Sequence, residues 1–541
     1  VTRPILLERK NRHPRLALGP TPNQRVETKK RSPTKAVAPE KEVSPKRDKH
    51  PNRGIPRLNV WQYLAYGGGD MANNVAFSMA MMFLPLYLTD VALLTPAFIG
   101  GMFLVMRFID AFTDVVMGMI IDRTDTRWGK FRPWILFGSV PLDVIAILNF
   151  AMPSSLHGTS GAMIYAAVAY FFMGSIAYTA VNIPYGSLAA AMTDRSEERS
   201  KLALFRTIGG SLMGVILALA IAPSVNKYAG QPDSLQSAIL KALIPLGFVA
   251  VALYVFLFLV ARENVPRSVD RVSVKESIRV IASNRPLQAL SLLTFVQLTG
   301  AFAQPGLMVC YARDVFGNAT VLAVVSPIGT LMIILFGWMI PGLIKKVGKV
   351  QLFIISALVG VCGNLVYFLA PTGALWALIV AAVLQGLGAG FGGTIIWNLE
   401  ADTVEYGEWK TGLRSEGTTY AVFSFVRKMG QALGGAAGLW IIGWFGYQGA
   451  ATVQTDSALT GIRIAVGVLP AVMSLIAIVL MIFYPMNDKQ HKQVIEEIAA
   501  RKAAEAPGEE RVEAEGEQAD KHEAKVLQES LERAEEDSAE F

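Results

Sequence analysis

Long apolar runs constrain this chain more than any other feature of its sequence. They recur through most of its 541 residues. About 20 apolar residues in a helix are enough to cross the ~30 Å hydrocarbon core of a bilayer. The chain is 52% hydrophobic and only 17% charged, which is too apolar for a water-soluble globular protein of this length. We therefore predict an all-α membrane protein.

Twelve of these runs are predicted to form transmembrane helices. They cover residues 61–88, 97–121, 133–152, 162–192, 202–225, 239–261, 288–311, 321–344, 350–370, 374–399, 418–446 and 462–485. The run at 288–311 is interrupted by Gln297, Gln304 and Pro305. It is retained because the alternation of charge between the connecting loops requires it.

Basic residues are concentrated in every second connection between the predicted helices. Numbered from a cytoplasmic start, the even-numbered connections contain 18 Lys and Arg residues, whereas the odd-numbered ones contain only Lys227 and Arg313. Because positively charged loops remain in the cytoplasm, both the N and the C terminus are predicted to be cytoplasmic.

The longest basic connection, residues 262–287, is predicted to be a cytoplasmic loop between two six-helix bundles at 58–261 and 288–487. A weak internal repeat supports this division. GMIIDRTDTRWGK at 118–130 follows the second predicted helix, and GWMIPGLIKKVGK at 337–349 follows the eighth. The general preference for basic cytoplasmic loops is the alternative explanation of this similarity.

The two tails are polar and opposite in charge. Residues 1–57 contain 16 Lys and Arg against 5 Asp and Glu, whereas residues 488–541 contain 8 against 17. We expect the first tail to be a disordered basic cytoplasmic arm, either a polybasic segment near anionic lipid or an extension without function. The acidic second tail is expected to be a solvated helix or disordered. No nucleic-acid partner is predicted.

The sequence does not suggest an enzyme. HExxH, GxSxG and phosphate-binding glycine motifs are absent, and the only cysteines, Cys310 and Cys362, lie inside apolar runs. We therefore predict no cofactor. A membrane sensor is a weaker alternative, because it would need a folded soluble domain that neither tail resembles. We expect a monomer whose partners are membrane lipid and a small molecule.

The second predicted helix contains three ionisable residues on one face. Arg107, Asp110 and Asp114 are separated by three and four residues. A charge at the centre of a membrane helix costs ~2.5–3.5 kcal/mol, so this face is predicted to line the protein interior. Two carboxylates one turn apart repel unless a cation lies between them, which favours a site for H⁺ or Na⁺ with Thr113 and Thr179 as neutral oxygen ligands. The alternative is that Arg107 neutralises one aspartate and supports helix packing.

The eleventh predicted helix carries Lys428 near the middle of its apolar stretch. A buried ammonium group needs an anionic partner, either the aspartate pair or a carboxylate of the substrate. The adjacent Arg427 points about 100° away and is expected to extend towards the cytoplasmic surface.

Polar residues in other apolar runs are candidates for binding a sugar. The amides of Asn73, Asn74 and Asn182 can donate to and accept from hydroxyl groups, and the indole of Trp397 can stack on a pyranose ring. Hydrogen bonds between helices would explain a single buried amide equally well. Gly67–Gly69 and Pro184 are expected to bend or break helices beside a cavity.

Six stretches resemble the glycoside-pentoside-hexuronide:cation symporter family of the major facilitator superfamily, over residues 58–490. They are AYGGGDMANNVAFSM at 65–79, YLTDV at 87–91, RFIDAFTDVVMG at 107–118, RWGKFRPWILFG at 127–138, VNIPYGSL at 181–188, and EADTVEYGEWKTGLRSEGTTYAVFSFVRKMGQALGG at 400–435. Within the family, the sequence is most similar to members that carry glucuronides.

The resemblance implies a major facilitator fold and a symporter driven by H⁺ or Na⁺. It places the cation at Asp110 and Asp114, which are also the metal ligands if the ion is Na⁺. In melibiose-type members two further aspartates bind the galactoside, and Asn74 and Asn182 match them in this sequence. Losing two negative charges suits an anionic sugar.

A hexuronate carboxylate is then expected to meet Lys428, with Arg107 and Arg206 as lesser candidates. The predicted substrate-binding residues are Asn73, Asn74, Tyr178, Asn182, Arg206, Trp397 and Lys428. The acidic run from Glu400 to Glu416 is expected either to pair with the basic loop at 122–130 as a cytoplasmic gate in the outward-facing state or to be solvated.

The sequence therefore predicts a multi-pass symporter of the inner, cytoplasmic membrane that imports a glycoside, preferably a β-glucuronide, together with H⁺ or Na⁺. A symporter of a neutral glycoside, a pentoside or another organic solute is the alternative.

Overall fold

The computed structural model describes residues 57–505 except 194, 266–281, 413–415 and 450. Nearly all of the predicted basic arm, most of the 262–287 loop and the end of the acidic tail lie outside these residues. The described residues form helices and connecting turns, and no strand occurs among them.

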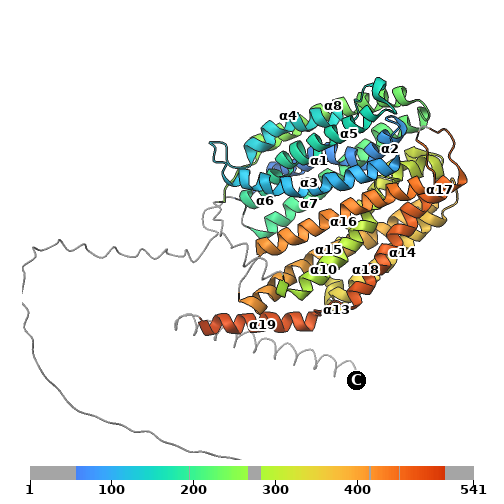
Figure 1. Ribbon diagram of the computed structural model, residues 1–541. Helices are drawn as coiled ribbons and strands as arrows, with labels where there is room; N and C mark the ends of the chain where they lie inside the picture. Colours follow the sequence, from blue (N-terminus) through green and yellow to red (C-terminus); the bar gives the residue numbers. More distant parts are fainter. Residues whose placement is uncertain (1–56, 194, 266–281, 413–415, 450, 506–541) are drawn as a thin grey trace, which may run out of the picture. The chain divides into compact units, whose positions relative to one another are not determined.

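The first group of helices contains α1 to α8 (Figure 1). Their bounds are α1 (Val60–Ser78), α2 (Leu84–Asp90), α3 (Pro96–Asp122), α4 (Arg132–Leu148), α5 (Ser160–Phe171), α6 (Thr179–Met192), α7 (Ser196–Lys227) and α8 (Pro232–Val260). Two π-helical segments, η1 (Met79–Phe83) and η3 (Phe172–Tyr178), join α1 to α2 and α5 to α6. A short 3₁₀ turn, Ser154–Leu156, precedes α5.

The second group contains α10 to α18 and is followed by α19. The bounds are α10 (Arg285–Ala303), α11 (Met308–Cys310), α12 (Leu322–Phe336), α13 (Ile340–Val347), α14 (Lys349–Leu369), α15 (Leu375–Thr411), α16 (Glu416–Trp444), α17 (Asp456–Arg463), α18 (Leu469–Ile482) and α19 (Asp488–Glu505). Two π-helical segments, η4 (Tyr311–Val315) and η7 (Ile464–Val468), and two 3₁₀ turns, Ala319–Val321 and Gly337–Met339, complete this group. The helix break between α10 and α11 coincides with the polar interruption at Gln304 and Pro305.

Among the described residues, nine helical segments are long and apolar enough to cross a membrane. They establish a multi-pass membrane protein. Three further predicted spans coincide with α3, α4 and α16, which are not among the nine; α4 has only 17 residues. The total of twelve spans therefore stays a prediction.

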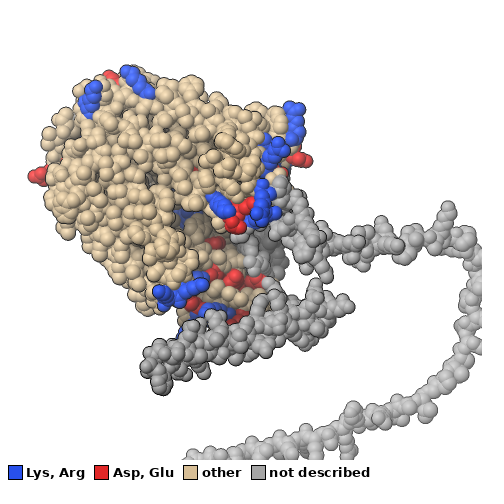
Figure 2. All heavy atoms as spheres, turned by 180° about the vertical axis from the view of Figure 1, so that it is seen from behind, with Lys and Arg blue, Asp and Glu red and all other residues tan. Residues whose placement is uncertain are grey.

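The two groups of helices share a hydrophobic core at one end only. One core includes Phe83 and Leu217 of the first group and Leu307 and Ile442 of the second. A separate core, which includes Phe353, belongs to the second group alone. Between the groups, α3 contacts α16 and α7 contacts α12. Figure 2 shows a hollow between the groups with charged side chains on its walls.

Glycines allow α1 and α7 to pack backbone against backbone. A Cβ atom at Gly209 would lie 2.1 Å from the carbonyl oxygen of Gly67, and one at Gly67 would lie 2.7 Å from the carbonyl oxygen of Phe205. The helix α1 continues through Gly67–Gly69, so the prediction that these glycines break the helix was wrong. Their function is close helix packing.

Candidate substrate and cation site

A cavity of about 330 Å³ lies between the two groups of helices. Its walls come from α1, α3, η3, α6, α7 and α16. Most of the predicted site residues line it, namely Asn73, Asn74, Arg107, Asp110, Asp114, Tyr178, Thr179, Asn182, Arg206 and Lys428. The fold therefore brings residues separated by more than 350 positions to one place.

Asp110 is held by two neighbours and is only 6% exposed. The hydroxyl of Ser175 donates a hydrogen bond to Asp110 Oδ1. A guanidinium nitrogen of Arg107 lies 3.5 Å from Asp110 Oδ2, which is the contact expected under the alternative that this arginine neutralises one aspartate. Ser175 belongs to the π-helical segment η3, which turns it towards α3.

Asp114 has a different set of partners. Thr179 donates to Asp114 Oδ1 over 3.0 Å, and the ammonium group of Lys428 forms an ion pair with Asp114 Oδ2. The aspartate of α3 is one of the two anionic partners expected for Lys428. Each aspartate therefore has its own cationic partner, one from the same helix and one from α16.

The oxygen atoms around the aspartates suit a hard cation. Asp110, Asp114, Ser175 and Thr179 offer carboxylate and hydroxyl oxygens, which are ligands for Na⁺ and equally acceptors for a proton. Thr113 is placed differently, because its hydroxyl donates to the backbone carbonyl of Asp110 in its own helix and it does not line the cavity.

Asn73 is the centre of a hydrogen-bond network that joins several helices. Its amide nitrogen donates to Tyr178 Oη over 3.2 Å and to Asn182 Oδ1 over 3.0 Å. Tyr254 of α8 donates to Asn73 Oδ1 over 3.3 Å. Since Asn73 is 2% exposed and satisfied on both sides, it positions Tyr178 and Asn182 at the cavity wall.

Asp70 is a site residue that the sequence analysis missed. Arg206 Nε lies 2.9 Å from Asp70 Oδ1, and Asn74 Nδ2 donates to Asp70 Oδ2 over 3.0 Å. Gly210 of α7 makes room for this group, because a Cβ atom there would lie 2.5 Å from Asp70 Oδ2. Asp70 lies within the first predicted span, so the cost of a charge in a membrane was the signal that could have found it.

Trp397 of α15 lies beside the cavity rather than in its wall. Its ring lies 4.5 Å below the guanidinium carbon of Arg427, which lines the cavity next to Lys428. Tyr420 and Phe423 contact the other parts of this indole, with ring centroids 6.1 Å and 5.8 Å away. Arg427, for which extension towards the cytoplasmic surface was considered more plausible than for Lys428, thus contacts Trp397 and lines the cavity.

The sequence is similar to sugar transporters along most of its length. The family described as MFS/sugar transport protein matches residues 65–488. The glucuronide carrier protein homolog of Escherichia coli (strain K12) is 40% identical over 441 residues, which cover 81% of this chain and 95% of the relative. This chain belongs to the glycoside-pentoside-hexuronide:cation symporter family. The resemblance noted in the sequence is thus confirmed.

Other relatives of this chain are also named as transporters. An uncharacterized symporter of Bacillus subtilis (strain 168) is 32% identical, with 82% of this chain and 96% of the relative covered. A putative sulfoquinovose importer of E. coli is 29% identical, with 84% and 97% covered.

Solved transporter structures share the fold of this symporter-family chain. A bacterial homolog of the human lysosomal transporter Spinster has a TM-score of 0.57 at 14% identity and covers 79% of this chain and 98% of its own. A nucleoside transporter has a TM-score of 0.54 at 12% identity, with 79% and 99% covered.

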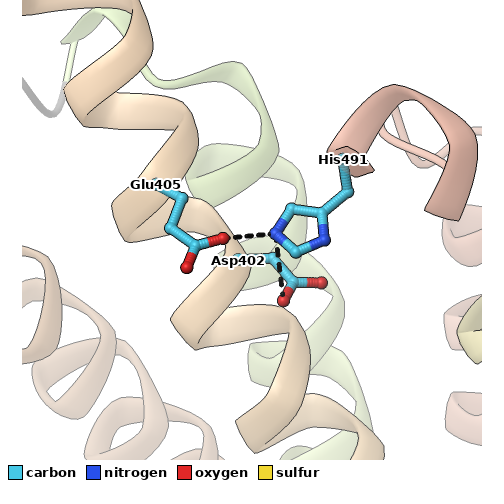
Figure 3. A group of neighbouring side chains, drawn as sticks. All are labelled: Asp402, Glu405 and His491. Carbon is cyan, nitrogen blue, oxygen red and sulfur yellow. Dashed lines mark hydrogen bonds and ion pairs between the residues drawn. The ribbon is translucent and has the colours of Figure 1, made fainter. Parts of the chain in front are cut away.

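A second cluster of ionisable residues connects α19 to α15. His491 Nε2 lies 2.5 Å from Glu405 Oε2 and 3.5 Å from Asp402 Oδ1 (Figure 3). These three side chains could hold a metal ion by their spacing. However, the ammonium of Lys349 already lies 2.8 Å from Asp402 Oδ1, so a cation is present in the cluster without a metal. The contact between Trp409 and Glu497, 2.6 Å long, also joins the two helices.

The acidic run of α15 was expected to pair with the basic loop at 122–130 or to be solvated. In this structure Asp402 and Glu405 pair with Lys349 and His491 of their own group of helices. The basic loop has another partner, since Glu263 accepts hydrogen bonds from the backbone amides of Lys130, Phe131 and Arg132. Asp402 and Glu405 are thus engaged with α14 and α19.

Proposed function

We propose that this protein is a cation-coupled symporter that imports a β-glucuronide across the inner membrane. The charge of the cavity carries this proposal. Four cationic and three anionic side chains line the cavity, so one positive charge remains when all of them are ionised. A substrate with one carboxylate neutralises that charge. The name of the E. coli relative, a glucuronide carrier homolog, supports the same substrate class.

Asp110 and Asp114 supply the coupling site in this proposal. The ammonium of Lys428 forms an ion pair with Asp114, so an incoming H⁺ or Na⁺ must displace it. The displaced ammonium is then uncompensated unless an anion binds in the same cavity. Cation and anionic substrate therefore stabilise each other's binding, which is the requirement for coupled transport.

Alternating access follows from the way in which the two groups of helices meet. They share a core at one end and have separate packing at the other. We propose twelve spans in two six-helix halves, cytoplasmic termini and a monomer in which the halves rock about the cavity. The shared core would open when the site faces the other side.

Transport into proteoliposomes tests the function directly. Uptake of a labelled β-glucuronide is measured under an imposed pH gradient and, separately, under an imposed sodium gradient. One of the two gradients is expected to drive accumulation above the external concentration. Equal internal and external concentrations under both gradients would disprove cation coupling, and no uptake at all would disprove transport of this substrate.

A symporter of neutral glycosides is the second candidate. The amide of Asn182 and the hydroxyl of Tyr178 at the cavity wall suit uncharged hydroxyl groups as well as a hexuronide. Competition between a glucuronide and the matching uncharged glucoside distinguishes the candidates. If the glucoside is the stronger competitor, the neutral substrate is correct.

A further inference from the structure

The charged groups of the cavity are paired unequally. Among the described residues, Arg107 pairs with Asp110, Arg206 with Asp70 and Lys428 with Asp114. Arg427 is the remaining cationic side chain in the cavity wall, and no carboxylate of the described residues forms an ion pair with it. The uncompensated charge of the cavity can thus be assigned to one guanidinium group.

Trp397 fixes this guanidinium without neutralising it. The 4.5 Å separation between the guanidinium carbon and the ring centre is a cation–π contact, which leaves the net charge of the cavity unchanged. Tyr420 stacks on the same indole with an interplanar angle of 21°, so the indole itself is supported from α16. The N–H groups of Arg427 remain available for an acceptor.

A guanidinium is suited to a planar anion. Its N–H groups form two parallel hydrogen bonds with a carboxylate, an arrangement that an ammonium group cannot reproduce. Lys428 is unsuited to this role because its ammonium is engaged with the cation site. Arg206 is engaged through Nε with Asp70, which leaves less of its charge for a ligand.

We propose that Arg427, held against Trp397, binds the carboxylate of the substrate and sets the preference for anionic over neutral glycosides, while Lys428 serves the cation site. This proposal rests on the proposed function. It reverses the expectation that Lys428 is the residue that meets the carboxylate.

The experiment compares wild-type protein with R427Q and R427K in proteoliposomes. Phenyl β-D-glucuronide and phenyl β-D-glucoside are the two probes, each measured as an inhibitor of labelled glucuronide uptake and, in labelled form, as a substrate. We expect R427Q to weaken glucuronide binding ~10- to 100-fold, the usual range for a lost charge-assisted hydrogen bond, and to leave glucoside binding within ~3-fold. R427K keeps the charge but loses the paired hydrogen bonds, so it should be intermediate.

Two controls separate charge recognition from structural damage. K241Q removes an exposed cation of α8 outside the cavity and should leave both affinities unchanged. At a saturating glucuronide concentration, the cation concentration for half-maximal transport should stay at its wild-type value in R427K, because Lys428, not Arg427, pairs with the cation site. A shift in cation dependence without a change in glucuronide preference would overturn the division of roles.

The outcomes also separate this inference from the proposed function. If wild type prefers the glucuronide and R427Q or R427K keeps that preference unchanged, Arg427 is not the anion-binding residue, although the function stands. If wild type transports the glucoside and rejects the glucuronide, both proposals fall.

Discussion

At the scale of single residues, the proposed cation site contains two aspartates whose partners differ. Asp110 has Ser175 and Arg107, and Asp114 has Thr179 and Lys428. The pairing with Lys428 crosses from α3 to α16, so it links the two groups of helices. Any cation that enters the site must compete with this ammonium.

Neutralising either aspartate should uncouple transport. In D110N or D114N the site loses the charge that attracts the cation, and we expect accumulation of a labelled β-glucuronide against its gradient to be abolished. Proteoliposomes with an imposed ion gradient provide the measurement. Full uphill transport in either variant would remove that aspartate from the coupling site.

Two threonines provide a matched test of which hydroxyl belongs to the site. Thr179 donates to Asp114, whereas Thr113 donates to the backbone of its own helix. T179V should raise the cation concentration for half-maximal transport several-fold, about the value of one hydrogen bond to a charged group. T113V should remain within about 2-fold of wild type. Equal effects of the two substitutions would contradict the geometry described here.

The sequence predicted that Arg107, Asp110 and Asp114 share an interior face, because charges in an apolar run are costly and the spacing of three and four residues places them together. Asp70 is also a charged residue in an apolar run, but it directly follows Gly67–Gly69 and was not predicted as a site residue. Ser175 carries no comparable signal, since a serine is common in membrane helices. The direction in which Thr113 or Arg427 points depends on neighbouring helices, which the sequence of one helix does not contain.

At the scale of helices, hydropathy predicted where the helices lie along the chain but not how they pack against one another. The break at Gln304 and Pro305 was visible as polar residues in an apolar run. The π-helical segments were not predicted, because hydropathy does not distinguish a π-helical turn from an α-helical one. The glycines of α1 were recognised as unusual, but only the contact with α7 explains them.

The contact between α1 and α7 should be sensitive to a single methyl group. G209A places a Cβ atom 2.1 Å from the Gly67 carbonyl oxygen, so the helices must separate, and we expect a loss of ~1–3 kcal/mol in stability. G214A, in the same helix with nothing within 4 Å, should be neutral or slightly stabilising. Thermal unfolding of the purified protein in detergent compares them. A lower midpoint for G214A than for G209A would refute this account of the packing.

At the scale of the whole molecule, one buried cluster joins the two groups of helices at the end where they share a core. Arg313 forms an ion pair with Asp90 at the end of α2, and it lies 3.0 Å from the hydroxyl of Tyr447. That hydroxyl also lies 3.6 Å from the sulfur of Cys310. Cys310 is 2% exposed, so it is shielded while the cluster is closed.

Weakening this cluster should expose Cys310. D90N removes the carboxylate that joins Arg313 to the first group of helices and leaves Arg313 with Asp314 of its own group, so D90N is expected to favour the state in which this end is open. In a C362S background, a membrane-impermeant maleimide added outside intact cells should label D90N at least about tenfold faster than the parent. D456N, an exposed acidic residue at the start of α17, serves as the control. Unchanged labelling of D90N would show that the pair does not hold this end closed.

The pairing of a monovalent cation with a monoanion in the cavity has an electrical consequence. When all seven charged side chains are ionised, the empty cavity carries one positive charge, and a cavity holding one such cation and one such anion carries the same charge. The loaded cavity therefore moves one positive charge across the membrane, and the empty cavity moves one positive charge back. A membrane potential of 100 mV, worth ~2.3 kcal/mol for each net charge moved, does no net work on this cycle. Accumulation would then depend on the concentration gradient of the coupling ion alone.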